Sequence, residues 1–333
     1  FWVGRLFVLL LGPLLGDAQA GRLSCALWFA LGTTALWYAT YRLARRAEAQ
    51  PVTFAFGGEA APRDYGRMLA DIAVLLLLGT IGIVVRMHEM TAETAALALL
   101  ACALFGSVLA LEAPLRGSLI AGLSIGALAL SRGAWPALWL LLAVMVALWV
   151  ALDRQQRRSA LAVVLPSAAA LAPISPLGSL MAPASLRAEY FDAWRRLAAG
   201  SLGLPQVADL AWIPRNLAWF TWPLWPLAAW TAYSWRHALR LPHIALPGLV
   251  LVALFIAFLT AQPVSDSGLM LLIPPLVLLA AFGATSLRRS LDNLIDWFAI
   301  ATFSLFALAA WLSFIAFVAG TPPRMAASVA RLV

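Results

Sequence analysis

Long apolar stretches, each close to the length of a membrane-crossing helix, recur along this 333-residue chain. The hydrocarbon core of a bilayer is roughly 30 Å thick, so a spanning helix needs about 20 predominantly apolar residues. Hydrophobic residues make up 63% of the chain and charged residues only 11%, whereas soluble domains carry about 25% charged residues. The sequence therefore predicts an all-α, polytopic transmembrane helical bundle.

The apolar stretches also predict how the chain is organised. Residues 1–20 are expected to form an outer-face interfacial segment, because glycines and a proline interrupt their apolar run. Residues 21–318 are expected to form the transmembrane helical domain, with a periplasmic loop at 176–216, and residues 319–333 a periplasmic tail that leads to a further C-terminal part. About ten spans are predicted, at residues 21–41, 68–85, 94–111, 117–131, 136–152, 160–175, 217–235, 244–262, 269–286 and 295–318.

All 23 basic residues are arginine, and the formal net charge is +8. The densest clusters, at residues 45–46, 154–158 and 288–289, fall on one side of the predicted topology. The positive-inside rule makes that side cytoplasmic. The excess positive charge then faces anionic lipid head groups, and no nucleic-acid partner is expected.

A short polar joint, Arg86-Met-His88-Glu89-Met-Thr91-Ala-Glu93, separates two of the apolar stretches. A charge at bilayer depth costs roughly 2.5–3.5 kcal/mol even on the mild insertion scale, and a simple turn could use Gly, Ser or Asn instead. The joint therefore indicates a functional role on the outer side. A structural alternative stays open: Thr91 is a plausible N-cap, Glu93 suits the first turn of a helix, and His88-Glu89 could be an interfacial hydrogen-bonded pair.

Arg132 closes the fourth predicted span on the same outer side, in the sequence Leu-Ser-Arg-Gly. The planar guanidinium fork suits phosphate oxygens, although an isolated arginine there could simply extend to the outer head groups. The loop 176–216 adds Arg187, Arg195 and Arg196 as further candidates for anion binding. Because that loop contains no histidine, we predict no metal ligands in the residues present.

Three segments, taken in order, resemble membrane glycosyltransferases of the GT-C fold, in particular glycosyltransferase family 39, which includes lipid A aminoarabinose transferases and protein mannosyltransferases. The joint resembles the family's "(T/S)-P-D" helix start, with Glu93 where the family usually has Asp. The segment ending in Arg132-Gly133 resembles "L-(T/S)-(K/R)-G", and Leu272–Leu276 resembles "L-L-P-P-L". The opening Phe1-Trp2-Val3 and the stretch 291–298 resemble further family segments.

The chain departs from the family in two places. The family's first outer loop, with an acidic pair, would lie before Phe1, so the sequence is expected to be an inactive fragment that lacks the N-terminal span. The family's late Lys/Arg has no counterpart, and Ser265-Asp266-Ser267-Gly268 occupies that region.

The resemblance implies that a sugar moves from a polyprenyl-phosphate donor to a lipid or protein acceptor on the periplasmic face of the bacterial inner membrane. It implies phosphate binding by Arg132, with Arg86, Arg187, Arg195 and Arg196 as secondary candidates. Glu93 is the expected carboxylate near the acceptor, with Glu89 and His88 tuning it. No cofactor is expected in the residues present, although a divalent metal is possible in the full-length protein.

Two other functions fit parts of the pattern. A secondary transporter would place charges near the bilayer midplane on broken helices in two repeated halves. Most ionisable residues here lie at the ends of predicted spans, and no internal repeat is evident, although several prolines could break helices. A non-catalytic membrane assembly subunit is the other alternative, in which the outer charges would be ordinary surface.

Overall fold

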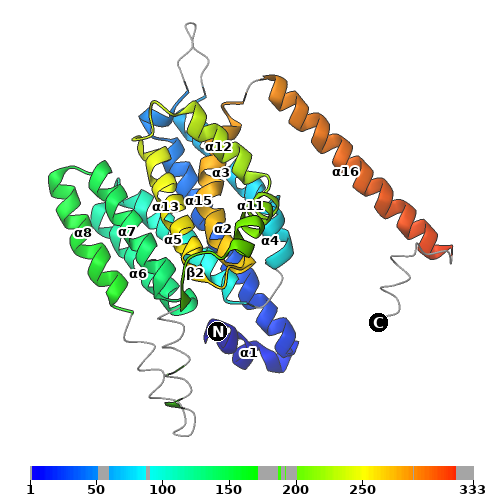
Figure 1. Cartoon of the computed structure of the whole chain (residues 1–333), viewed down its shortest axis with the longest axis horizontal. Helices are drawn as coiled ribbons and strands as arrows, with labels where there is room; N and C mark the ends of the chain where they lie inside the picture. The colour runs from blue at the N-terminus through cyan, green and yellow to red at the C-terminus, as the bar shows by residue number, and fades with distance from the viewer. Residues whose placement is uncertain are drawn as a thin grey trace. The chain divides into compact units, whose positions relative to one another are not determined.

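The computed structural model describes residues 2–51, 60–87, 91–171, 187–188, 192, 201–287 and 289–319. The chain divides into two compact units, Phe1–Thr285 and Ser286–Val333. The first unit is a bundle of helices, and the described part of the second is the single long helix α16 (Arg289–Val318) (Figure 1).

In chain order, the described helices of the first unit are α1 (Trp2–Leu15), α2 (Asp17–Ala44), α3 (Pro62–Leu78), α4 (Ile81–Arg86), α5 (Ala92–Ala110), α6 (Pro114–Arg132), α7 (Ala134–Ala151), α8 (Arg154–Ala169), α11 (Val207–Phe220), α12 (Leu224–Ser234), α13 (Pro242–Leu259), α14 (Asp266–Leu269) and α15 (Ile273–Ala284), with 3-10 turns η1 (Ala47–Ala49) and η2 (Met270–Leu272). The two-residue strands β1 (Ser201–Leu202) and β2 (Ala261–Gln262) pair antiparallel.

The helical membrane fold predicted from the sequence is confirmed, but the number of spans is not. Within the described ranges, five helical segments are long and apolar enough to cross a bilayer, namely Ala92–Ala110, Pro114–Arg132, Ala134–Ala151, Pro242–Leu259 and Asp266–Ala284. Within the described residues, helices also occupy the other predicted spans in whole or in part. The prediction of about ten spans therefore stays a prediction.

Two of the predicted spans are each broken into two helices. The range 68–85 divides at Gly79-Thr80 between α3 and α4, and the range 217–235 divides at Thr221–Pro223 between α11 and α12. Glycine is a poor helix former, and proline removes a backbone donor and crowds the preceding turn. Average hydropathy is insensitive to these backbone effects, which is why each broken segment resembles one continuous span.

The last ten residues of the predicted loop 176–216 belong to a helix. Helix α11 begins at Val207, and the backbone N–H of Gln206 donates to the Asp209 carboxylate at 2.7 Å. This is half of the capping-box arrangement that stabilises helix starts. Most of the earlier part of the predicted loop lies outside the described residues.

Helices α5 and α6 form a hairpin joined by residues 111–113, and glycines let their backbones approach closely. A Cβ atom on Gly106 would lie closer than 3.0 Å to the backbone of Ala121, and one on Gly117 closer than 3.0 Å to the backbone of Ala110. Small residues at such crossings are typical of packed transmembrane helices. The hairpin brings the first turn of α5 and the last turn of α6 to the same end of the bundle.

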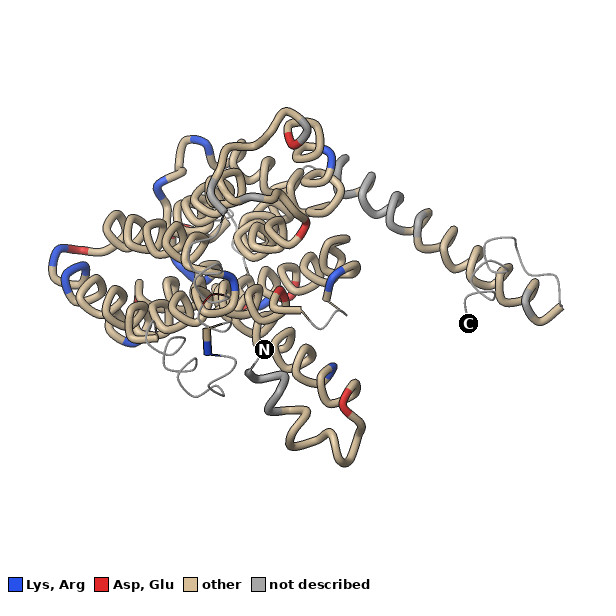
Figure 2. Tube along the Cα trace, turned by 60° about the horizontal axis from the view of Figure 1, so that its bottom comes forward, with Lys and Arg blue, Asp and Glu red and all other residues tan. Residues whose placement is uncertain are grey.

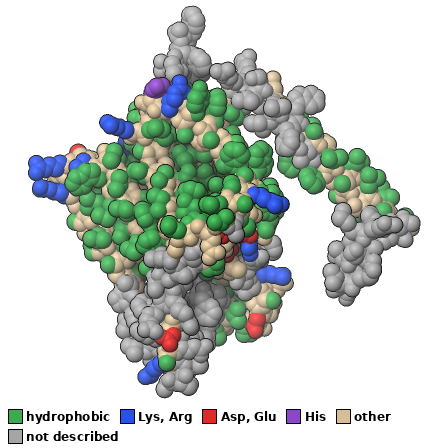
Figure 3. Space-filling model, viewed as in Figure 1, with side chains coloured by type: hydrophobic (Ala, Val, Ile, Leu, Met, Phe, Trp, Pro, Cys, Tyr) green, Lys and Arg blue, Asp and Glu red, His purple; other side chains and the backbone are tan. Residues whose placement is uncertain are grey.

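The exterior of the bundle is strongly apolar between its charged ends. Figure 2 shows the charged positions mainly at helix ends and in connections, with uncharged helix between them. Figure 3 shows a broad hydrophobic face on the first unit. On α7 alone, Leu138, Leu142, Trp149 and Val150 are each more than half exposed. Exposed apolar surface of this extent is unusual for a soluble monomer. It is the kind of surface that a multi-pass membrane protein has.

Candidate functional site

Four helix ends meet at one end of the bundle, and two arginines there contact the segment that follows α13. Arg86, the last residue of α4, donates from Nη2 to Asp266 Oδ2 at 3.3 Å. Arg132, the last residue of α6, donates from Nη2 to Ser267 Oγ at 3.1 Å. We define the charged cluster as these four residues together with Glu93 of α5. Its members come from four helices, α4, α5, α6 and α14, and α14 lies more than 130 residues after the others in the sequence.

Glu93 is the buried carboxylate of the charged cluster. It lies in the first turn of α5 and is only 9% exposed. Its charge is close enough to that of Arg132 for the two to attract each other, while Oε2 is buried without a hydrogen-bond partner in the described part of the chain. Burying a carboxylate is costly unless a positive charge or donors compensate it. Arg132 supplies that charge, and one carboxylate oxygen is left as an unused acceptor.

The helix start that precedes Glu93 agrees only in part with the N-cap prediction. Thr91 is the N-cap residue of α5, with an extended backbone at φ −114°, but its side chain makes no capping hydrogen bond. Glu93 does lie in the first turn, where a carboxylate interacts favourably with the helix dipole. The helix therefore begins where it was predicted to begin, but the Thr91 side chain does not form the predicted capping hydrogen bond.

The position of Arg132 is determined by the chain reversal that follows it. Gly133 has φ +93°, in the region that favours glycine, and the chain turns directly into α7. The indole Nε1 of Trp135 then donates to Thr260 Oγ1 at 2.9 Å. Arg132 and Trp135 thus both contact residues 260–267, which follow α13, and Ser265 Oγ lies 2.9 Å from Ser267 Oγ. This segment is the common support for the two arginines.

Two predicted site residues, Arg86 and Arg132, contact the adjacent residues Asp266 and Ser267, and a third, Glu93, interacts electrostatically with Arg132. Four others, His88, Glu89, Arg195 and Arg196, lie outside the described residues. Arg187 is exposed in a two-residue described segment, so its relation to the charged cluster stays a prediction. In the described ranges, no group of three or more His, Cys, Asp or Glu side chains is arranged to hold a metal ion.

Asp266 and Ser267 are site residues that the sequence does not predict. They contact arginines 180 and 135 residues away along the chain. The signal available in the sequence is weak: Asp266 is the first acidic residue after Asp209, and it lies between two serines before an apolar helix. That pattern indicates an unusual polar turn but cannot identify its partners.

The opposite end of the bundle also carries arginines, with different partners. Arg42 pairs with Glu112, and Arg46 Nε donates to Glu48 Oε1 at 2.6 Å. Arg157 lies over the Trp149 ring at 4.3 Å from its centroid. We call this the basic end, because it includes the predicted cytoplasmic arginine clusters of α2 and α8.

Partial burial raises the pKa of the Glu48 carboxyl, but the hydrogen bond from Arg46 opposes that effect. Together with a hydrogen bond to the backbone and the attraction of nearby positive charges, it holds the pKa of Glu48 below its ordinary value of 4.5. At neutral pH, Glu48 is therefore ionised, and its carboxylate accepts the hydrogen bond from Arg46.

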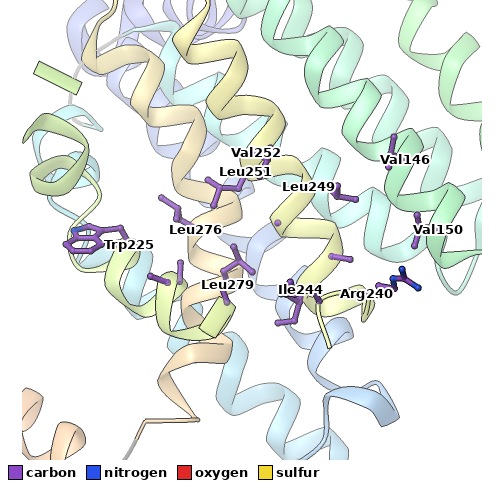
Figure 4. A pocket seen from close by; sticks show the side chains of 16 residues that line it. Val146, Val150, Trp225, Arg240, Ile244, Leu249, Leu251, Val252, Leu276 and Leu279 are labelled. Atoms are coloured by element: carbon purple, nitrogen blue, oxygen red, sulfur yellow. The ribbon is translucent and has the colours of Figure 1, made fainter. Parts of the chain in front are cut away.

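An apolar groove of about 670 Å³ runs between α7, α12, α13 and α15, with Arg240 at its edge (Figure 4). On α13 its lining includes Ile244, Leu249 and Val252. These residues belong to the first eleven of that helix, whereas the charged cluster follows its last residue. The groove and the charged cluster therefore occupy opposite halves of the bundle.

The whole arrangement is similar to two solved structures. They are ArnT from Cupriavidus metallidurans bound to undecaprenyl phosphate and ArnT from the same organism in the apo state, each with 19% sequence identity and a TM-score of 0.58 over 95% of this chain. This chain shares the fold of ArnT. It spans about half the length of those proteins, 53% and 52% respectively. No family model and no curated protein matches the sequence.

The likeness to ArnT confirms the predicted GT-C-like fold and, at this sequence identity, shows the fold alone. Family 39 within that fold, and the roles of single residues, stay predictions.

Proposed function

We propose that this protein is a membrane glycosyltransferase that moves a sugar from a polyprenyl-phosphate donor to a lipid or protein acceptor on the periplasmic face of the bacterial inner membrane. The observation that carries the proposal is the charged cluster, in which Arg86 and Arg132 contact the adjacent residues Asp266 and Ser267 and the buried Glu93 interacts electrostatically with Arg132. It is supported by the shared fold, because one of the similar structures is that of ArnT bound to undecaprenyl phosphate.

The two arginines are suited to hold the donor's phosphate. Each guanidinium offers several N–H donors in a plane, which match phosphate oxygens. Both side chains are partly accessible at the bundle end, and each now contacts a small polar group, Asp266 or Ser267, that a phosphate oxygen can replace. In the transfer, positive charge fixed beside the phosphate stabilises the negative charge that develops as the sugar leaves.

The reaction breaks the bond between the anomeric carbon and the phosphate oxygen, and the electron pair stays on that oxygen. The acceptor hydroxyl oxygen forms the new bond to the anomeric carbon, and its proton must go to a base. Glu93 is the described carboxylate placed to orient that hydroxyl or to take its proton, since Oε2 is an unused acceptor. We therefore propose Glu93 as the acceptor-side carboxylate and as an auxiliary base.

Binding of undecaprenyl phosphate to the purified protein in detergent tests the proposal. We expect Arg132→Ala to weaken binding by about 30-fold or more, because truncating one partner of a buried charged pair typically costs about 2–5 kcal/mol. The matched control is Arg158→Ala, an exposed arginine near the start of α8, which should bind the lipid as the wild type does. Equal binding by wild type and Arg132→Ala, or equal losses in both variants, would contradict the proposal.

Transfer of a labelled sugar by the full-length protein separates the transferase from its rivals. Sugar incorporation into an extracted lipid or protein acceptor is the expected result. Substrate uptake into proteoliposomes without any sugar transfer would instead identify a transporter, and neither activity would be expected of an assembly subunit.

A further inference from the structure

The charged cluster contains as many negative as positive side chains. Arg86 and Arg132 are balanced by Asp266 and Glu93, so the described part of the site is close to neutral. The two carboxylates differ in exposure, because Glu93 is 9% exposed whereas the Asp266 side chain is 36% exposed. Asp266 is therefore the more accessible carboxylate of the charged cluster, and it contacts Arg86 directly, at 3.3 Å from Nη2.

The lipid phosphate changes its charge during the proposed reaction. In the sugar-bearing donor it is a diester with one negative charge. After the sugar leaves it is a monoester, whose second proton dissociates with a pKa of roughly 6, so at neutral pH the product carries close to two negative charges. A nearly neutral site that contains an accessible carboxylate binds these two species with different affinities.

We propose that Asp266 competes with the lipid phosphate for Arg86 and thereby weakens binding of the doubly charged product relative to the singly charged donor. This inference rests on the proposed function, since it takes the charged cluster to be the phosphate site. Like charges repel in proportion to their product, so Asp266 opposes the dianion more than the monoanion. Its role is to assist release of the polyprenyl phosphate and to determine which phosphate ester the site prefers.

Other charged groups near Asp266 do not replace it in this role. Helix α11 packs against α14, and it carries Asp209, whose carboxylate accepts from the Gln206 backbone, and the exposed Arg215. Glu93 is directed to Arg132. The described charged groups on the elements around Asp266 are therefore Arg86, Glu93, Arg132, Asp209 and Arg215.

The substitution Asp266→Asn tests the inference, because it removes the charge while keeping the size of the side chain and leaves the contact between Arg132 and Ser267 in place. We expect the variant to bind undecaprenyl phosphate about fivefold more tightly than the wild type at pH 7.5, the upper end of what a partly exposed ion pair contributes. At pH 5, where the phosphate carries one charge, the gain should fall to about twofold or less. Neutral undecaprenol should bind both proteins equally.

Two control variants make the result specific. Asp266→Glu keeps the charge and should bind as the wild type does. Asp153→Asn removes one negative charge at the basic end, where Asn caps a helix as well as Asp does, and it should leave binding unchanged. Each variant is first checked for a single monodisperse peak in size-exclusion chromatography.

Weaker or unchanged binding by Asp266→Asn, or a gain that does not grow between pH 5 and pH 7.5, would overturn the inference. If Arg132→Ala has already failed to weaken binding, the proposed function itself fails. If Arg132→Ala weakens binding and Asp266→Asn changes nothing, the phosphate site stands and the role of Asp266 is wrong.

Discussion

The two ends of the bundle both contain arginines paired with carboxylates, but the partners come from different distances along the chain. At the basic end, Arg46 pairs with Glu48, two residues away, and Arg42 pairs with Glu112, 70 residues away. In the charged cluster, Arg86 and Arg132 contact a segment 180 and 135 residues away. The charged cluster differs further because its two arginines converge on adjacent residues, Asp266 and Ser267. Convergence of distant charges on one short segment indicates a built site.

The carboxylates at the two ends differ in the same way. Glu48 accepts a hydrogen bond from Arg46 and is partly exposed, so its negative charge is satisfied locally. Glu93 is buried, and its Oε2 has no partner among the described residues. Buried polar atoms in native proteins are nearly always hydrogen-bonded. An exception beside Arg132 is consistent with an atom that receives a proton or hydrogen bond from a substrate.

The largest expected effect comes from separating α5 and α6, which carry Glu93 and Arg132 of the charged cluster. In Gly117→Ala, the new methyl group would meet the backbone of Ala110 closer than 3.0 Å, so α5 and α6 must move apart. We expect the free energy of unfolding to fall by about 3 kcal/mol or more, which is at or beyond the upper limit of the usual cost of overpacking. Undecaprenyl phosphate binding should be lost with it. Thermal unfolding in detergent, followed by tryptophan fluorescence, measures the change.

The matched control is Gly248→Ala in α13, where an added Cβ meets nothing within 4 Å. Alanine is a better helix former than glycine by about 1 kcal/mol, so this variant should be as stable as the wild type or slightly more stable. Equal stability of the two alanine variants would show that the close approach of α5 and α6 does not support the site.

The charged cluster and the helices that carry it show which features the sequence predicts and which it does not. The apolar ranges and the placement of Glu93 and Arg132 at the same end of the bundle follow from hydropathy and the order of the predicted spans, and the GT-C-like fold follows from the resemblance of short motifs. The contacts of Asp266 and Ser267 do not, because nothing local in the sequence specifies a partner more than a hundred residues away. The break at Gly79 is not predicted, and prolines are identified only as residues that could break helices, because average hydropathy does not change at such a break.

Glu93→Gln tests whether the buried Glu93 carboxylate has a catalytic role that the carboxylates of the basic end do not have. It keeps the side-chain size and removes the base, so sugar transfer by the full-length protein should fall by about 100-fold, at the lower end of the effect of general acid–base groups. Undecaprenyl phosphate binding should be unchanged or tighter, because a negative charge beside Arg132 is removed. The control is Glu112→Gln at the basic end, which should retain activity. Loss of lipid binding in Glu93→Gln would indicate a structural role instead.

A smaller effect is expected where the support segment is attached to α7. Trp135→Phe removes the indole donor to Thr260, which should lower the free energy of unfolding by about 1 kcal/mol, the usual net contribution of one hydrogen bond. Trp149→Phe at the basic end is the comparison. Trp149 is 56% exposed, and phenylalanine at this position keeps an aromatic ring for Arg157. Its effect on the unfolding midpoint should be the smaller of the two. An equal shift in both would mean that the Trp135 hydrogen bond contributes nothing specific.

The smallest effect, and the one that depends on pH, is expected from Glu48→Gln. Because the folded protein holds the pKa of Glu48 below its ordinary value of 4.5, the ionised pair with Arg46 stabilises the folded state above that pH, and this stabilisation is lost as the pH falls below it. The variant should be less stable than the wild type at pH 7 by less than about 1 kcal/mol, because the pair is partly exposed. The difference between the unfolding midpoints of the two proteins should be constant from pH 7 to pH 5 and should shrink progressively as the pH falls below 4.5. A difference that does not shrink below pH 4.5 would mean that Glu48 acts through packing and that its charge is not what stabilises the basic end.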